Sequence, residues 1–135
     1  MKRVRFLTTE QVLEIHREMI ERYGGDGAIR NLGLIDAAVA MPRQAFGGRC
    51  LHPSIASMAA AYLHHLSLNH GFVDGNKRTA AAAALVFLDA NRRELALTID
   101  ELERLTLDVA SSGLDKARLI QVFEAACRRR PPGRR

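Results

Sequence analysis

A run of five alanines, Ala80 to Ala84, limits most strongly what this chain can fold into. Alanine is the best helix former, and its small side chain lets a neighbouring backbone approach closely. The run continues into Leu85, Val86, Phe87 and Leu88, so the segment predicts a buried helix. We expect this central helix to begin near Asn76 and to end near Ala90, with Asn91 as a left-handed cap.

Five further helices are predicted around the central one. Thr8 with Gln11 and Thr98 with Glu101 have the spacing of capping boxes, and Asp115 can cap the last helix. Pro53 suits the first turn of another helix. The expected segments are residues 8–24, 31–40, 53–69, 98–111 and 115 onward, with possible short strands near 42–50 and 95–98. The result is a compact all-α domain over residues 1–127, with a possible hairpin at 41–51.

Composition excludes several classes of protein. At 135 residues the chain suits one domain with an ordinary apolar core. It has no apolar run of 18 residues and no apolar region near Met1, so we expect neither a membrane span nor a secretory signal, and a cytoplasmic location. Cys50 and Cys127 are isolated thiols, for which a disulfide is not expected. A zinc site on His52, His64 and His65 is also not expected, because adjacent histidines on a helix point in different directions.

The positive charge is concentrated at the C-terminal end. The formal net charge is +5, and five arginines with no acid occur in residues 128–135, so the remainder of the chain is neutral overall. A short segment of Arg, Pro and Gly predicts a disordered, solvated tail. Nucleic-acid binding is therefore a weak alternative, one that deletion of residues 128–135 and salt dependence would test.

The candidate functional residues lie in the segment from His70 to Ala80. Asp74, Gly75 and Asn76 are turn formers placed directly before the central helix. The first turn of a helix presents unpaired N–H groups and partial positive charge, which together favour a bound phosphate. Lys77 and Arg78 stand where acidic residues are normally preferred, so an anion is expected to join them.

Each polar residue of the segment has a candidate role. His70 can take a proton near neutral pH or cap the preceding helix. Asp74 can form the turn and also bind Mg²⁺ together with phosphate oxygens. Gly75 lets the backbone approach a phosphate, Asn76 can cap the helix and donate to a phosphate oxygen, and the planar fork of Arg78 suits phosphate. We expect Phe72 to anchor the loop, Thr79 to face the helix surface or the pocket rim without a role of its own, and His16 to be structural.

The spacing His70-x-Phe72-x-Asp74-Gly75-Asn76-Lys77-Arg78 resembles the Fic motif in the form carried by Doc (death-on-curing) toxins. Segments 6–11, 29–35, 41–48 and 87–91 resemble Doc in the same order, so the likeness covers about residues 4–125. Gly71 departs from the proline often found there. The resemblance implies a Fic/Doc helical fold, with segment 41–48 as a flap that holds a target peptide beside His70.

The same resemblance implies a function. Doc-like proteins are kinases that bind ATP with Mg²⁺ and transfer its γ-phosphate, whereas general Fic enzymes have Gly in place of Lys77 and transfer a nucleoside monophosphate. The expected catalytic residues are His70, Asp74, Lys77 and Arg78, with Asp74 as the metal ligand and Gly75, Asn76, Lys77 and Arg78 holding the nucleotide. The implied target is elongation factor Tu, whose modification arrests translation. An adenylyltransferase of the Fic type and a non-catalytic binding module are the alternatives.

A last expectation concerns how the activity of such a protein would be inhibited. Many Fic proteins contain an inhibitory motif, Ser/Thr-x-x-x-Glu-Gly/Asn, whose glutamate reaches the phosphate-binding arginine. No glutamate in these 135 residues precedes Gly or Asn. We therefore expect a separate antitoxin protein as partner, bound in an apolar groove beside the motif.

Overall fold

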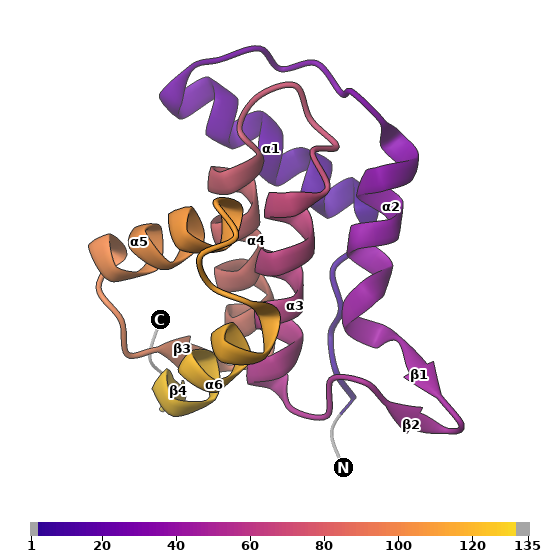
Figure 1. Cartoon of the computed structure of the whole chain (residues 1–135), viewed down its shortest axis with the longest axis vertical. Helices are drawn as coiled ribbons and strands as arrows, with labels where there is room; N and C mark the ends of the chain where they lie inside the picture. Colours follow the sequence, from indigo (N-terminus) through magenta and orange to yellow (C-terminus); the bar gives the residue numbers. More distant parts are fainter. Residues whose placement is uncertain (1–2, 132–135) are drawn as a thin grey trace.

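The computed structural model describes residues 3–131, which form six α-helices and two small pairs of strands (Figure 1). The helices are α1 (Thr9–Tyr23), α2 (Leu32–Ala40), α3 (Ile55–Leu68), α4 (Asn76–Ala90), α5 (Ile99–Ala110) and α6 (Lys116–Ala126). A 3-10 turn, η1 (Met41–Arg43), follows α2. The antiparallel pairs are β1 (Ala45–Phe46) with β2 (Arg49–Cys50), and β3 (Arg93–Leu95) with β4 (Cys127–Arg129). The predicted all-α class is confirmed.

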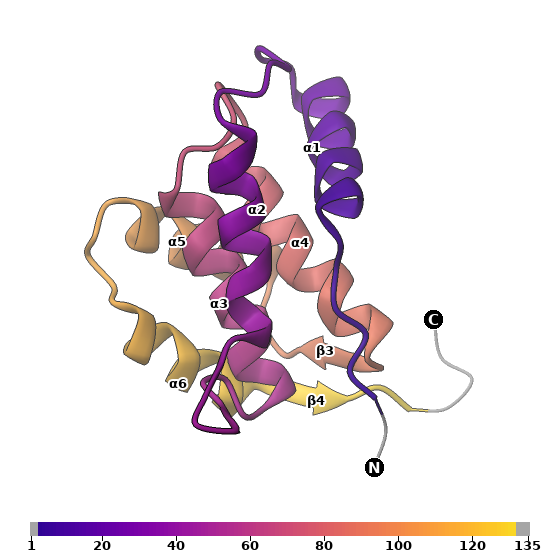
Figure 2. The same ribbon diagram turned by 90° about the vertical axis from the view of Figure 1, so that its right-hand side faces the viewer.

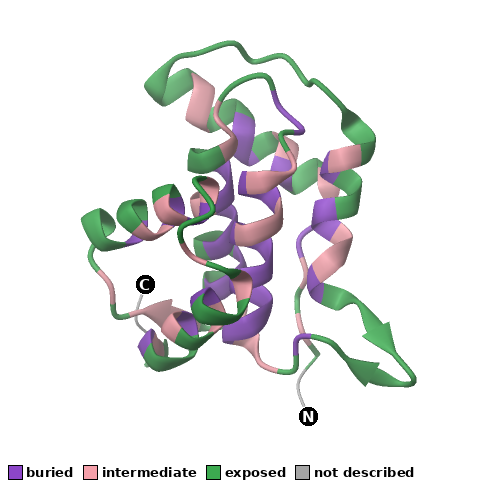
Figure 3. Ribbon diagram, in the orientation of Figure 1, coloured by how far each residue is buried: buried purple, intermediate pink, exposed green. Residues whose placement is uncertain are grey.

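Helix α3 forms the centre of the domain, and α4 packs along it (Figures 2 and 3). Ala59 and Ala60 of α3 and Ala83 of α4 are completely buried, so the two backbones approach closely. This is the packing that the alanine run predicts. The sequence assigns the central place to α4, but α3 is the more enclosed helix, because α2, α5 and α6 also pack against it.

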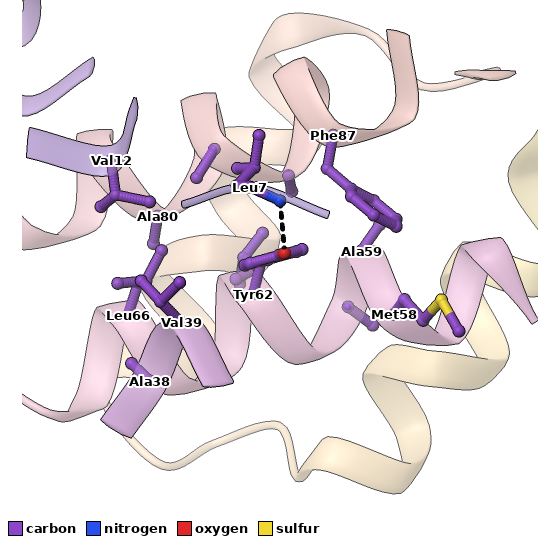
Figure 4. Close-up of a cluster of buried hydrophobic side chains, with 14 of the residues drawn as sticks. Leu7, Val12, Ala38, Val39, Met58, Ala59, Tyr62, Leu66, Ala80 and Phe87 are labelled. Carbon is purple, nitrogen blue, oxygen red and sulfur yellow. Dashed lines mark hydrogen bonds between the residues drawn. The ribbon is translucent and has the colours of Figure 1, made fainter. Parts of the chain in front are cut away.

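Tyr62 connects the N-terminal segment to this centre (Figure 4). Its ring is fully buried and lies 5.0 Å from the Phe87 ring, measured between centroids. Its hydroxyl accepts a hydrogen bond of 2.9 Å from the Leu7 backbone N–H. Because a buried phenol needs a polar partner, this bond satisfies both groups and fixes the chain before α1.

The predicted caps are confirmed at three helices. Thr8 and Thr98 both form capping boxes, and Asp115 accepts a hydrogen bond from the Arg118 N–H. Two other predicted ends are wrong. Pro53 precedes α3 rather than lying in its first turn, because Ser54 forms the capping box with Ser57.

The end of α4 also differs from prediction. Asn91 is not left-handed, having φ −108°, and Arg92 takes the left-handed conformation with φ 59°. The Asn91 side chain explains the shift, because it exchanges two hydrogen bonds with the backbone of Arg5. These bonds hold the N-terminal segment against the end of α4.

The basic C-terminal segment begins as an ordered strand. In the β3–β4 pair, Arg128 lies opposite Glu94 and Arg129 lies opposite Arg93. The predicted boundary after residue 127 falls inside β4, so the prediction of a disordered tail is wrong for Arg128 and Arg129. Pairing with β3 satisfies backbone groups that a free tail would leave to water. Arg130 continues this contact, since its backbone N–H donates to the Arg92 carbonyl at 2.9 Å, and the last four residues of the predicted tail, 132–135, lie outside the described residues.

The predicted hairpin is present, but it does not lie beside the motif. Its turn is formed by Gly47 and Gly48, both with positive φ. Figures 1 and 2 place β1 and β2 at the opposite end of α3 from the loop that precedes α4. The cause is α2, which starts at that loop and carries the chain away over nine residues, about 13 Å of helix. The expectation that this hairpin lies next to His70 is therefore wrong.

Candidate functional site

The loop between α3 and α4 leads directly into the first turn of α4 (Figure 1), and Gly75 to Arg78 at this junction form the candidate anion cradle. Gly75 is the N-cap of α4, with φ 82°, and no side chain caps this helix. The N–H groups of Asn76, Lys77 and Arg78 occupy the first turn, where a helix offers them no carbonyl partner. A positive φ at Gly75 and an uncapped helix start are the features that a phosphate needs for close approach.

Asn76 holds the loop rather than capping the helix. Its side-chain oxygen accepts from the Phe72 N–H at 3.1 Å, and its Nδ2 donates to the Phe72 carbonyl at 2.9 Å. The prediction that the Asn76 side chain caps α4 is wrong, because Gly75 takes that position. The amide side chain is occupied by Phe72, so any contact of Asn76 with phosphate is expected from its backbone N–H.

His70 is exposed and lies in a strained backbone conformation. Its φ is 52°, a left-handed value that favours glycine and costs other residues about 1–2 kcal/mol. Its carbonyl accepts from Arg30 Nε at 2.8 Å, while the Gly71 carbonyl accepts from the N–H groups of Arg30 and Asn31 at 2.9 and 3.0 Å. Glycine would end α3 at lower cost, so His70, like Arg92 and Ser112, is a position where a side chain is kept in a strained backbone conformation.

The connection between α1 and α2 supports the loop along its length. Val73 donates to the Ala28 carbonyl at 3.1 Å, and Ile29 forms an isolated antiparallel bridge with Phe72. This support could not be predicted from the sequence, because residues 24–31 show no strand pattern. The three glycines among them are the only signal that the backbone, rather than side chains, makes the contacts.

Asp74 is oriented by the same connection. Its Oδ2 accepts from the Asp26 N–H at 2.9 Å, and no group within residues 3–131 donates to its Oδ1. The residue is exposed, so one carboxylate oxygen is free for a hard cation. Mg²⁺ is commonly held by one or two carboxylates together with phosphates and water, and the donors present fit that arrangement. Across residues 3–131, no cluster of three or more His, Cys, Asp or Glu side chains could hold a metal without such a co-substrate.

Lys77 and Arg78 supply the positive charge. Both are exposed, and neither pairs with a carboxylate in the part of the chain that the structure describes. The Arg78 guanidinium lies 4.5 Å from the centroid of the Tyr23 ring. This stacking covers one face of the guanidinium and leaves its in-plane N–H groups available to an anion. Thr79 is completely buried, so its expected place on the helix surface is wrong.

The cradle residues lie at the surface, with Lys77 and Arg78 exposed and Gly75 and Asn76 half-buried. Two hollows, of about 470 and 450 Å³, lie elsewhere: one between α3, β3 and α6, the other between α5 and α6. Neither is lined by any residue of the loop.

Gly71 is required by packing behind the loop. It is buried, and a Cβ added there would overlap Cγ1 of Ile35, which is only 1% exposed. We expect Gly71→Ala to lower the free energy of unfolding by about 1–3 kcal/mol, as overpacking of a core does. Thermal or urea unfolding measures the change.

Gly27→Ala is the matched control, because its Cβ would meet Ile20 at an ordinary 3.6 Å. Combining Gly71→Ala with Ile35→Ala should cost less than the sum of the two single changes. Strict additivity would contradict the predicted clash.

Three histidines and a lysine meet between α3 and α6, away from the loop. The His64 and His65 rings lie 4.8 Å apart, and Lys116 Nζ donates to His65 Nε2 at 2.9 Å. Burial, followed by the charge of Lys116, lowers the pKa of His65 to about 4, and burial also lowers the pKa of His52 and of His64. The folded state therefore favours neutral imidazoles here.

This cluster predicts acid sensitivity. A histidine with a lowered folded pKa contributes stability that is complete above its unfolded pKa of about 6.5 and is lost as the pH falls toward 4. For His65 we expect a loss of about 1–2 kcal/mol, since water around the partly exposed ring reduces the full effect. His65→Gln keeps an acceptor for Lys116 and should flatten the unfolding free energy between pH 6.5 and 4. An equally steep curve for this variant would contradict the prediction.

The fold is a helical domain in which an exposed histidine, His70, precedes a helix start that no side chain caps. A family model described as the Fic/DOC family matches residues 6–88. The chain is 44% identical over 95 residues to a protein named Toxin Doc from Mycolicibacterium smegmatis, covering 69% of this chain and 73% of that protein. It is 30% identical over 111 residues to a protein named Protein kinase doc from Escherichia phage P1, covering 80% and 84%. The chain therefore belongs to the Fic/Doc family, and the resemblance seen in its motif is confirmed.

Proposed function

We propose that this chain is a Doc-like toxin that transfers the γ-phosphate of ATP to a hydroxyl group of a bacterial protein. The observation that carries the proposal is the loop from His70 to Arg78. Within nine residues it carries an exposed imidazole, a carboxylate oxygen with no donor among residues 3–131 and two cations with no carboxylate partner among them, next to a helix start that no side chain caps. Phosphoryl transfer needs mainly positioning and charge stabilisation, which such a loop can supply.

Each residue has a defined part in the proposed reaction. The His70 ring takes the proton of the target hydroxyl as its oxygen forms a bond to the γ-phosphorus. The bond between that phosphorus and the bridging oxygen breaks, and ADP leaves. Asp74 would hold Mg²⁺, which supplies charge neutralisation to the phosphates when bound. The first-turn amides, Lys77 and Arg78 bind the phosphate oxygens through charge-assisted hydrogen bonds.

Lys77 favours a kinase over an adenylyltransferase. In general Fic enzymes a glycine at this position lets the backbone close around the α- and β-phosphates. Lys77 adds a side chain and a charge to the first turn of α4, so the cradle differs from one suited to monophosphate transfer. The name of the phage P1 relative, Protein kinase doc, supports the same choice.

The two activities release different products, and this difference tests the proposal. The purified chain is incubated with ATP, Mg²⁺ and a bacterial lysate cleared of small nucleotides. A kinase releases ADP as the target is modified, whereas an adenylyltransferase releases pyrophosphate. We expect ADP formation that depends on both the lysate proteins and His70, and pyrophosphate in its place would defeat the kinase assignment.

The target and the partner follow from the family resemblance. We propose elongation factor Tu as the modified protein, so that translation stops, and a separate antitoxin as the restraint. A cytoplasmic site of action fits this target. Across residues 3–131, no helix is both long and apolar enough to cross a membrane.

Growth provides the test of the toxin assignment. We expect expression of the wild-type chain alone to arrest bacterial growth, and expression of His70→Ala at the same level to permit it. The rate of amino-acid incorporation into protein should fall before growth stops. Normal growth with abundant soluble wild-type protein would contradict both the toxin and its need for an antitoxin.

A further inference from the structure

His16 of α1 lies beneath the motif loop, although it stands 58 positions from Asp74 in the sequence. The residue is only 3% exposed. Its ring stacks on the Phe72 ring with centroids 3.7 Å apart and planes within 9° of parallel. Its Nε2 is 2.8 Å from the backbone carbonyl oxygen of Asp74. A carbonyl can only accept, so the proton of this bond belongs to Nε2.

This bond fixes the orientation of one peptide group in the cradle. In a trans peptide the C=O and the following N–H point in opposite directions within one plane. The Asp74 carbonyl is held toward His16, so the Gly75 N–H must point away from His16. Rotation of that peptide would break this part-buried hydrogen bond and leave the Nε2–H of the buried His16 side chain without its partner, which is costly.

The contacts around Gly75 also place the backbone of the cradle against His16. A Cβ added there would lie 3.4 Å from Cδ2 of His16 and 3.3 Å from Cδ1 of Ile20. The backbone of the cradle thus rests directly on the imidazole and on α1. Packing alone would be served by a phenylalanine or leucine at position 16, whereas the polar Nε2–H serves only the Asp74 carbonyl.

We propose that His16 is a positioning residue of this site, outside the motif, whose Nε2–H sets the Asp74–Gly75 peptide for phosphate binding. The inference rests on the proposed function, since His16 would act by supporting the backbone of the same phosphate-binding residues. Its effect should appear in the affinity for ATP as well as in turnover, because the loop would be preorganised before the nucleotide arrives.

Two substitutions separate the hydrogen bond from the stacking. His16→Phe keeps an aromatic ring against Phe72 and removes the donor, whereas His16→Gln removes the ring and offers an amide donor at a similar reach. For His16→Phe we expect the Kd for ATP to rise and transfer to fall, each by about 10–100-fold, as for other outer partners of a site. We expect His16→Gln to keep most of both, with a lower melting temperature than His16→Phe.

ATP binding is measured by calorimetry on folded protein, with thermal unfolding of each variant alongside. A His16→Phe variant with wild-type affinity and turnover would overturn the proposal, and so would a His16→Gln variant as impaired as His16→Phe. The affinity does not depend on which phosphate is transferred. A result that defeats the kinase assignment is therefore distinguishable from one that defeats the role of His16.

The hydrogen bond of His16 can also be tested in the wild-type chain, so that the result does not depend on whether a variant folds. The nitrogen chemical shifts of an imidazole report which ring nitrogen carries the proton. We expect the His16 Nε2 to be protonated in the free protein and its N–H to exchange slowly with water. A neutral ring protonated only at Nδ1 would overturn the proposal.

Discussion

Replacement of His70 by alanine is expected to reduce phosphate transfer by about 10²–10⁴-fold, the range typical for loss of a positioned general base. ATP binding should remain close to wild type, because the groups proposed to hold phosphate lie further along, at Lys77, Arg78 and the first-turn amides. Single-turnover transfer from labelled ATP measures the loss, and calorimetry measures the binding. Near wild-type turnover would remove His70 from the mechanism.

His70→Gly is the companion variant. Glycine adopts the observed φ of 52° without strain, so the folded state should be as stable as wild type or more stable, by up to about 1 kcal/mol. Activity should nevertheless be lost as it is for alanine. A gain in stability together with loss of transfer would show that the histidine is kept for chemistry at a cost to the fold. A clear loss of stability would show that its ring supports the structure.

Asp74→Asn should reduce transfer by about 100-fold or more, because a bound metal ion contributes several kcal/mol of charge stabilisation. The amide oxygen of asparagine can still accept from the Asp26 N–H, so the loop should keep its position and the melting temperature should change little. The residual activity should no longer respond to Mg²⁺ concentration. Transfer is measured over a Mg²⁺ titration for wild type and variant.

Asp74→Ala is the contrasting change, since it removes both the charge and the acceptor for Asp26. Its transfer activity should fall by as much as that of Asp74→Asn, and its melting temperature should also be lower than that of wild type. If Asp74→Asn kept full, Mg²⁺-dependent transfer, the metal would have to be held by other residues and the proposed ligand would be wrong.

The helices were predictable because their signals are local. The alanine run and the capping residues Thr8, Thr98 and Asp115 act within a few positions of where they stand. The candidate residues of the site could be named for the same reason, since His70, Asp74, Lys77 and Arg78 share one short segment, and their roles stay predictions.

The support of the site was not predictable, because it comes from distant parts of the chain. Arg30 reaches the His70 carbonyl across 40 positions, and Asp26 reaches Asp74 across 48. Contacts to backbone carbonyls and N–H groups leave little trace in side-chain patterns. The position of the hairpin was missed likewise, because it depends on the direction in which α2 leaves the loop.

The central claim is that this loop delivers the γ-phosphate of ATP to protein, and two labelled nucleotides test it most directly. The purified chain is incubated with a bacterial lysate and Mg²⁺, with ATP labelled at the α-phosphate in one reaction and at the γ-phosphate in the other. His70→Ala serves as the control in both. We predict that only the γ label enters protein, and only with the wild-type chain. Entry of the α label without the γ label would contradict the kinase assignment and establish nucleotidyl transfer in its place.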